Sequence, residues 1–402
     1  MLESIGNNAF GNSAISSFKV TKNVKKLNGS AFFGCISLNS FEVVSGNSFY
    51  RTTDNVLLNG TATVLVAYPA GAQTKDIYSI PAGVQSIGES AFAYAKIDEV
   101  DLSAVSVIGD TAFNYSSLTS VSFPDSVNRV GLRAFSNCEE LTEVKWGNNM
   151  TSAPDGIFTN CSSLTSIRIP ATVYSIGENA FSGSGLTKIE FEDGSRLAEI
   201  CESAFESTNL LEIEIPNEVS VIEKSAFRGV PSLATVEFRD NSNLRMIGES
   251  AFASTPSLSS IKLPQSLVTI GYDAFSLSGL TVIEFSSNIK KVGSGAFSYC
   301  RELTDISVDE LNEVYISADG VLYNKDMTTL VTYPAGHERK QFTVPETVVT
   351  VGASAFKGTA NLTDVILPEG LRMIETGAFC GVDKLNKISI PDSVEQLSRL
   401  AF

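Results

Sequence analysis

The hexapeptide IGESAF at Ile87–Phe92 occurs a second time at Ile247–Phe252, and IGENAF occupies Ile176–Phe181. Its last two letters, Ala-Phe, recur along the chain at intervals of 21 to 25 residues, apart from two intervals near 60. Phe158 stands in the same series but follows isoleucine instead of alanine. Repetition at this period indicates an architecture of stacked units. These landmark phenylalanines are Phe10, Phe32, Phe92, Phe113, Phe135, Phe158, Phe181, Phe205, Phe227, Phe252, Phe275, Phe297, Phe356, Phe379 and Phe402.

One unit, here called a rung, reads L-x-x-I-x-I-P-x-x-V-x-x-I-G-x-x-A-F-x-x-C/S-x. The alternating I-x-I predicts a strand with one buried face, and the proline after it ends that strand. The glycine suits either a turn with positive φ or a close approach of two backbones. A polar residue two positions before many of the phenylalanines is expected to cap a short helical turn.

About 23 residues cannot bury a core alone, so each rung must cover the apolar side chains of its neighbours. We expect the I-x-I strands to pair in parallel, about 4.8 Å apart. The landmark phenylalanines are then expected to form a buried spine, and Trp146, in the last apolar slot of its strand, to lie in the core.

The segment A-F-x-x-C resembles the BspA-like type of leucine-rich repeat, with Cys35, Cys138, Cys161 and Cys300 three residues after a landmark phenylalanine. The resemblance implies a repeat solenoid, a right-handed superhelix with a concave parallel β-sheet and with short helical turns and loops on its convex side. We therefore expect one domain over residues 1–402, with about 17 rungs of 21–25 residues. The resemblance also implies a secreted or cell-surface protein that binds an extracellular protein or glycan.

The two long intervals contain related segments, DNVLLNGTATVLVAYPAG at Asp54–Gly71 and DGVLYNKDMTTLVTYPAG at Asp319–Gly336. Each reads as a strand, a turn and a second strand, and Asn59-Gly60 is a strong signal for a two-residue turn. We expect β-hairpin insertions over about residues 49–71 and 314–336. They are either structural interruptions of the stack or elements that contact a ligand.

Composition excludes several kinds of partner. The net charge of −16 opposes binding to nucleic acid or to an anionic membrane surface. The sequence contains no run of about 18 apolar residues, so no segment is expected to insert into a membrane. The first residues lack the pattern of a signal peptide, and the chain stops at a landmark, Leu400–Phe402. We expect a monomeric module whose signal or anchor lies outside this chain.

No catalytic or metal-binding pattern is present in the sequence. The single histidine, His337, lies in a charged loop, and the cysteines show no zinc-ligand spacing. Neighbouring rungs place Cys138 and Cys161 side by side, but their side chains should point the same way, so free thiols are expected. The sequence therefore predicts no enzyme, no cofactor and no metal.

The exposed positions of the I-x-I strands form columns of charged residues. Solenoids of this kind usually bind ligands on the concave face. Glu190, Glu214 and Glu237 follow one another on successive rungs, which favours a site for cations or for a basic protein surface. The alternatives are a face that is merely solvated and a structural spacer or envelope scaffold that carries other domains. The candidate ligand-binding residues are Glu99, Asp101, Lys145, Arg168, Glu190, Glu212, Glu214, Glu237, Lys262 and Glu284.

Overall fold

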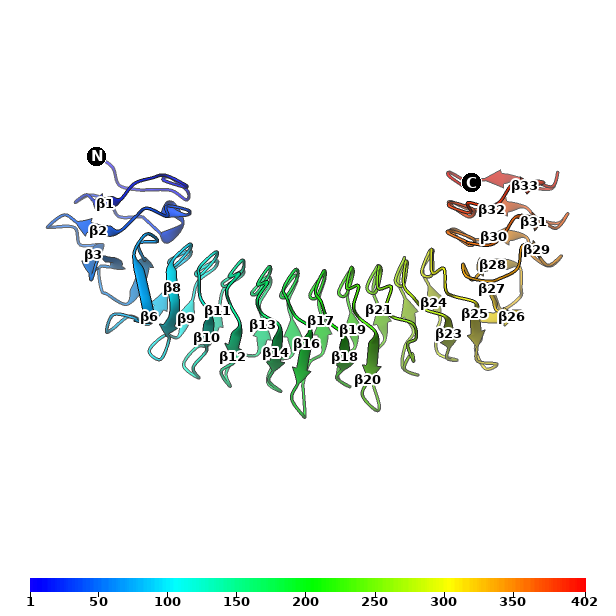
Figure 1. The fold of residues 1–402 in the computed structure, drawn as a ribbon, viewed down its shortest axis with the longest axis horizontal. Helices are drawn as coiled ribbons and strands as arrows, with labels where there is room; N and C mark the ends of the chain where they lie inside the picture. The colour runs from blue at the N-terminus through cyan, green and yellow to red at the C-terminus, as the bar shows by residue number, and fades with distance from the viewer. The chain divides into compact units, whose positions relative to one another are not determined.

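The computed structural model describes the backbone of residues 1–402 and every side chain except those of residues 74–76. The chain is a β-solenoid of about 16 turns with parallel sheets. It divides into two compact units, Met1–Leu197 and Ala198–Phe402. Figure 1 shows the strands of each unit stacked in the order of the chain. One short 3₁₀ helix, η1 (Gly29–Phe32), is the single helix of the described backbone.

Most rungs carry a long strand, formed by I-x-I, and a two-residue strand, formed by the residues before the glycine. The long strands of the first unit are β1 (Ser17–Val20), β2 (Ser40–Val43), β6 (Gln73–Ser79), β8 (Lys96–Asp101), β10 (Ser120–Ser122), β12 (Glu143–Lys145), β14 (Ser166–Ile169) and β16 (Lys188–Phe191). Its short strands are β7 (Ser86–Ile87), β9 (Val107–Ile108), β11 (Arg129–Val130), β13 (Ser152–Ala153) and β15 (Ser175–Ile176).

The second unit repeats this arrangement. Its long strands are β18 (Glu212–Ile215), β20 (Thr235–Phe238), β23 (Val282–Phe285), β25 (Asp305–Val308), β29 (Gln341–Thr343), β31 (Asp364–Ile366) and β33 (Lys387–Ile388). Its short strands are β17 (Glu199–Ile200), β19 (Val221–Ile222), β21 (Met246–Ile247), β22 (Thr269–Ile270), β24 (Lys291–Val292), β30 (Thr350–Val351), β32 (Met373–Ile374) and β34 (Gln396–Leu397).

The long strands confirm the alternation that the sequence predicts. In β14, Ile167 and Ile169 are buried while Ser166 and Arg168 are exposed. The strands pair in parallel and in register, as Ile167 does with Ile189. Most of these ladders, however, join only two strands, such as β10 with β12 and β14 with β16. The short strands form the longer ladder, which in the second unit runs β17-β19-β21-β22-β24.

The Ala-Phe segments form a third ladder instead of the expected helical turns. The N–H of Phe227 donates to the carbonyl of Ala251 on the next rung at 2.8 Å. Ser225 (φ 54°) and Gly229 (φ 65°) flank this phenylalanine in the left-handed region. Their N–H groups donate to the next rung as well. The left-handed residues turn alternate N–H groups toward the neighbouring rung, so no helix forms. The polar residue that the sequence predicts to be a helix cap instead adopts the left-handed conformation.

The recurring glycine of I-G is explained by close approach of two backbones and not by positive φ. Gly271 lies outside the left-handed region. A Cβ atom added to it would stand 2.5 Å from the carbonyl carbon of Gly248 and 2.6 Å from the nitrogen of Glu249. Those atoms belong to the backbone of the preceding rung and cannot move aside. The glycine therefore sets the distance between rungs at this corner.

The landmark phenylalanines form the predicted spine. Phe227 and Phe252 are fully buried, and their rings stack with centroids 5.1 Å apart and planes 4° apart. Trp146 is half-buried and packs against Phe123 and Phe158, at 5.9 Å and 6.0 Å between ring centroids. It belongs to the edge of the core.

The two hairpin segments confirm the antiparallel pairing but contain three strands each. In the first, β3 (Tyr50–Thr53), β4 (Val56–Asn59) and β5 (Val64–Ala67) form a meander. The second repeats it with β26 (Tyr315–Ala318), β27 (Val321–Asn324) and β28 (Thr329–Thr332). The last strand of each, β5 or β28, pairs in parallel with the short strand of the next rung, β7 or β30.

Tyr68 continues the spine through the first of these segments. Its N–H donates to the carbonyl of Ala91 at 2.7 Å, and its ring stacks on Phe92 with centroids 5.1 Å apart. The two-residue turn expected at Asn59-Gly60 is wrong, because the loop runs to Thr63. The side-chain oxygen of Asn59 accepts hydrogen bonds from the N–H groups of Thr63 and Val64 and holds this longer loop closed.

Candidate ligand-binding face

The candidate residues lie on one side of the rungs, here called the long-strand face. It consists of the outward-pointing side chains of the long strands and of residues 259–263, which occupy the same place in their rung without forming a strand. Nine of the ten candidates are exposed, and Glu99 is half-buried. The strand alternation causes this exposure, since each candidate follows or precedes a buried or half-buried apolar residue.

Several candidates in the first unit are paired with a residue of opposite charge on their own strand. Lys188 lies 2.6 Å from Glu190 on β16, and Lys145 lies 2.9 Å from Glu143 on β12. The hydrogen bond from Lys188 lowers the pKa of the Glu190 carboxyl, and the hydrogen bond to Glu143 raises the pKa of Lys145. Both pairs are exposed, so solvent weakens them.

In the second unit, Glu214 and Glu237 are register partners on β18 and β20. The expected acidic column is therefore present there, but its charge is partly offset. Arg239, which follows β20, lies 3.0 Å from Glu214. No pair is recorded for Glu237 within the described part of the chain. Arg239 stands just beyond the I-x-I segment and was not among the predicted residues; its place two residues after Glu237 is the only signal for it in the sequence.

Arg168 and Glu190 come together at a first groove. They are register partners on β14 and β16. With Glu143 and Lys188 they line a groove of about 260 Å³ that reaches across to β12, which belongs to a different sheet from β14. Arg168 also lies 3.2 Å from Glu192, a residue that the sequence argument did not single out.

Lys262 and Glu284 come together at a second, larger groove. It has a volume of about 540 Å³ and lies where residues 259–263 leave the ladder of long strands open. Buried Phe285 and exposed Val282 add apolar surface to its lining. Among the described side chains, neither Lys262 nor Glu284 has an ion-pair partner within 4.0 Å. Two opposite charges therefore remain available in one groove.

The remaining candidates do not join these grooves. Glu99 and Asp101 lie on β8, and Asp101 accepts a hydrogen bond from the N–H of Ser103 at 2.9 Å. That bond lowers the pKa of Asp101 and gives the carboxylate a role in the turn after the strand. Glu212 faces Thr235 in register.

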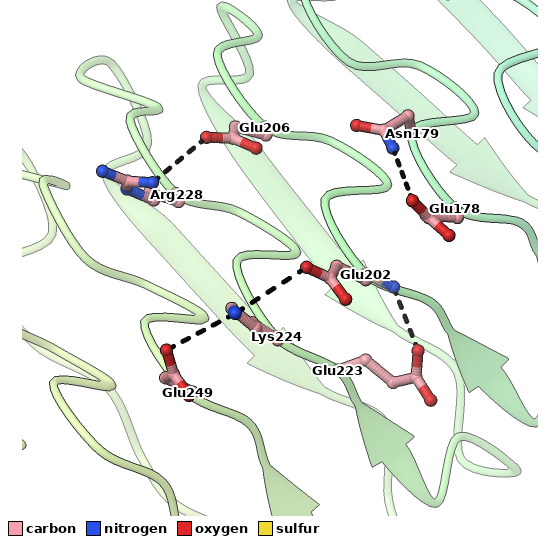
Figure 2. A network of polar contacts seen from close by, with 8 residues as sticks. All are labelled: Glu178, Asn179, Glu202, Glu206, Glu223, Lys224, Arg228 and Glu249. Carbon is pink, nitrogen blue, oxygen red and sulfur yellow. Dashed lines mark hydrogen bonds and ion pairs between the residues drawn. The ribbon is translucent and has the colours of Figure 1, made fainter.

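Charged pairs also cross between rungs on the turn side of the second unit, as Figure 2 shows. Lys224 lies 4.0 Å from Glu202 and 3.6 Å from Glu249, and Arg228 lies 3.7 Å from Glu206. These pairs join three successive rungs, at exposed positions except for the half-buried Glu206. Much of the charge on this side is thus engaged within the chain itself.

Other reactive groups do not form a site with one another. His337 is half-buried, and its Nδ1 atom accepts a hydrogen bond from the N–H of Arg339 at 3.2 Å. Burial, followed by the charge of Arg339, lowers its pKa. Within the described residues no group of three His, Cys, Asp or Glu side chains could hold a metal ion. No helix in that part of the chain has the length and apolarity to cross a membrane.

A comparison with known protein families finds a match over almost every rung of the chain. A family model described as "BspA type Leucine rich repeat region (6 copies)" matches residues 2–60, 85–201, 198–328 and 335–402. No curated protein matches the chain.

Among solved structures, the pneumococcal vaccine antigen PcpA is 24% identical over 86% of this chain and 68% of its own, with a TM-score of 0.45. A leucine-rich cell surface protein from Faecalibacterium prausnitzii is 26% identical over 86% of this chain and 83% of its own, with a TM-score of 0.45. A leucine-rich repeat protein from Eubacterium ventriosum is 24% identical over 69% of this chain, with a TM-score of 0.43, and the chain covers 63% of it.

Proposed function

Because the chain belongs to the BspA-type leucine-rich-repeat family, we propose that it is a non-enzymatic interaction module. Its long-strand face binds an extracellular protein or glycan, and the module works outside the cell or at its surface. Repeat solenoids present extended surfaces of this kind, and leucine-rich-repeat modules generally bind proteins. The location rests on the resemblance of the A-F-x-x-C repeat to this family.

The groove at Lys262 and Glu284 carries the proposal. Its volume of about 540 Å³ falls within the usual range of ligand sites. Apolar side chains such as Val282 stand beside the two unpaired charges. A partner that brings opposite charges and some apolar surface would neutralise both Lys262 and Glu284 and cover Val282. Elsewhere on the face Lys188 pairs with Glu190 and Arg239 with Glu214, whereas a partner at this groove would meet two opposite charges that no described side chain neutralises.

A structural role is the second candidate, and a specific observation favours it. Lys188 with Glu190, and Lys145 with Glu143, are pairs within single strands of the first unit. A face whose charges satisfy one another resembles a solvated surface that only carries neighbouring domains. The two functions differ at the groove, because only a binding module requires unpaired charges such as Lys262 and Glu284 to contact a partner.

The test compares the wild-type chain with a double charge reversal, Lys262→Glu with Glu284→Lys. The immobilised chains are incubated with solubilised extracellular-matrix proteins, and each retained protein is then purified and its affinity measured. A matched control, Arg372→Glu with Glu395→Arg, exchanges an ion pair between the residues that immediately precede β32 and β34, away from the groove. We expect the groove reversal to weaken binding by about tenfold or more and the control to leave it unchanged. Equal binding by all three chains, at equal melting temperatures, would favour the spacer.

A further inference from the structure

Two stacked tyrosines stand where the fold does not require aromatic residues. Tyr94 and Tyr115 occupy the left-handed position two residues after a landmark phenylalanine, each with φ 60°. The next two rungs place Asn137 and Asn160 there, and the third has Gly183. Asparagine and glycine adopt this conformation readily, whereas a bulky side chain is strained in it. The stack therefore tolerates a small residue at this position, and the two tyrosines need another explanation.

The two rings form a fixed apolar wall. Their centroids are 4.8 Å apart and their planes differ by 10°. Phe33 supports them from the side, with its centroid 5.0 Å from that of Tyr94 in an edge-on arrangement. Tyr115 remains 43% exposed, and the neighbouring Ile36 is 56% exposed. An aromatic surface is thus held in place by packing and left open to solvent.

Polar residues line the same groove as the two tyrosines. Gln73, Lys96 and Asp98 come from the beginnings of β6 and β8, and Ser117 and Glu140 come from the following rungs. Together with the tyrosines they enclose about 470 Å³. No ion pair is recorded for Lys96, Asp98 or Glu140 among the described side chains, which leave out residues 74–76. The groove therefore combines hydrogen-bond donors and acceptors with an aromatic wall.

We propose that this groove binds a neutral sugar ring, as part of a short oligosaccharide. A pyranose has an apolar face of C–H groups, which packs on an aromatic surface, and hydroxyl groups at its edge that both donate and accept hydrogen bonds. Asp98 and Glu140 accept from such hydroxyls, and Lys96 and Gln73 donate to them. The two carboxylates oppose an anionic ligand, as does the net charge of the chain.

This site is separate from the groove at Lys262 and Glu284, which belongs to the other unit, so either can fail without the other. The sequence signal for it was present, because Tyr occupies the same slot in two successive rungs.

The test measures binding of two soluble probes, cellotetraose and chitotetraose, by calorimetry and by saturation-transfer NMR. Tyr115→Asn is the informative variant, because it installs the residue that Asn137 and Asn160 already supply in this conformation. We expect it to weaken saccharide binding by about tenfold or more while the melting temperature stays equal or rises. Tyr115→Phe keeps the ring and should retain binding within about threefold.

Tyr174→Asn serves as the control, since Tyr174 is 54% exposed in the same unit and does not line the groove. It should leave saccharide binding unchanged. An oligolysine peptide is measured in parallel, because two carboxylates could also attract a basic peptide. The proposal is overturned if neither saccharide binds, if only oligolysine binds, or if Tyr115→Asn binds as the wild type does. If the saccharides bind neither the wild type nor any variant, and Tyr115→Asn also lowers the melting temperature, the proposal is overturned as well. The ring of Tyr115 then serves only to pack the stack.

Discussion

The Sγ atom of Cys138 lies 3.1 Å from the carbonyl oxygen of Phe113, the landmark phenylalanine of the preceding rung. The same contact joins Cys161 to Phe135 at 3.2 Å and Cys300 to Phe275 at 3.0 Å. The thiol is a weak donor that is small enough for this buried slot. The cysteine of A-F-x-x-C thus ties two successive rungs together through the backbone of the spine.

The stability of the protein at alkaline pH should depend on Cys138. Burial, the main cause, raises the pKa of its thiol from 9.0 to about 12. The folded state holds the proton more tightly, so this contribution is complete below pH 9 and is lost as the pH rises toward 12. Cys138→Ser keeps a donor but does not ionise there. Denaturant unfolding at a series of pH values should give the variant a shallower alkaline loss of stability, and parallel curves would contradict the assignment.

All six cysteines should titrate as free thiols once the chain is unfolded without reductant. The structure has six free cysteines, of which Cys201 and Cys380 are half-buried and the other four are buried. A chromogenic thiol reagent should therefore react slowly with the native protein, first at those two. Six thiols are expected in guanidinium chloride, and a count of four or fewer would reveal a disulfide.

Phe205→Ala should destabilise the protein severely. Phe205 is fully buried, and its ring stacks on Phe227 with centroids 5.2 Å apart. Truncation leaves a cavity that costs about 3–5 kcal/mol. Phe402 is 48% exposed and stacks on Phe379, so Phe402→Ala should cost much less. Thermal melts of the two variants decide the matter, and equal losses would refute the buried spine.

Gly271→Ala should be destabilising although alanine is usually tolerated. The added Cβ atom would meet the backbone of Gly248 and Glu249 at 2.5 Å and 2.6 Å. Overpacking of this kind costs about 1–3 kcal/mol. Gly370→Ala is the control, because the nearest atom to its Cβ, the carbonyl oxygen of Glu346, is 3.9 Å away. Its free energy of unfolding should change by no more than about 0.5 kcal/mol, and a similar loss in both would exclude a role for rung spacing.

The acidic column is tested by replacing Glu190, Glu214 and Glu237 together with glutamine. We expect weaker binding to an oligolysine peptide, because three exposed negative charges of the long strands are lost. The melting temperature should change little, because Glu190 and Glu214, the carboxylates that pair with Lys188 and Arg239, are themselves 50% and 55% exposed, which weakens both pairs.

A matched control replaces Glu3, Glu178 and Glu369, three exposed carboxylates off the long-strand face. It removes the same net charge, so it separates the column from the general attraction of an acidic protein. If both triple variants bind oligolysine equally, the column is only a solvated face.

Much of the core was predictable, because the spacing of the sequence repeat determines which residues are buried. Once Phe181 and Phe252 are seen to occupy the same slot of a repeat, their burial follows, and so does that of Ile167 and Ile169 in the alternating strand. The candidate face was predictable to the same extent, since outward positions alternate with buried ones. Which of its charges pair was not, because Arg239 reaches Glu214 from the rung after it.

The sequence by itself determined the solenoid, the buried columns and the places where hairpins enter, because these depend on which residue types recur at which spacing. Only the tertiary structure decided how rungs meet: that Ser225 adopts the left-handed region, that Gly271 lies against Gly248, and that the ladder of long strands opens beside Lys262. These features arise from distances between atoms of neighbouring rungs. The repeat in the sequence shows that the rungs are alike, but it does not specify how one rung is displaced relative to the next. Hydrogen bonds, close contacts and grooves between rungs all depend on that displacement.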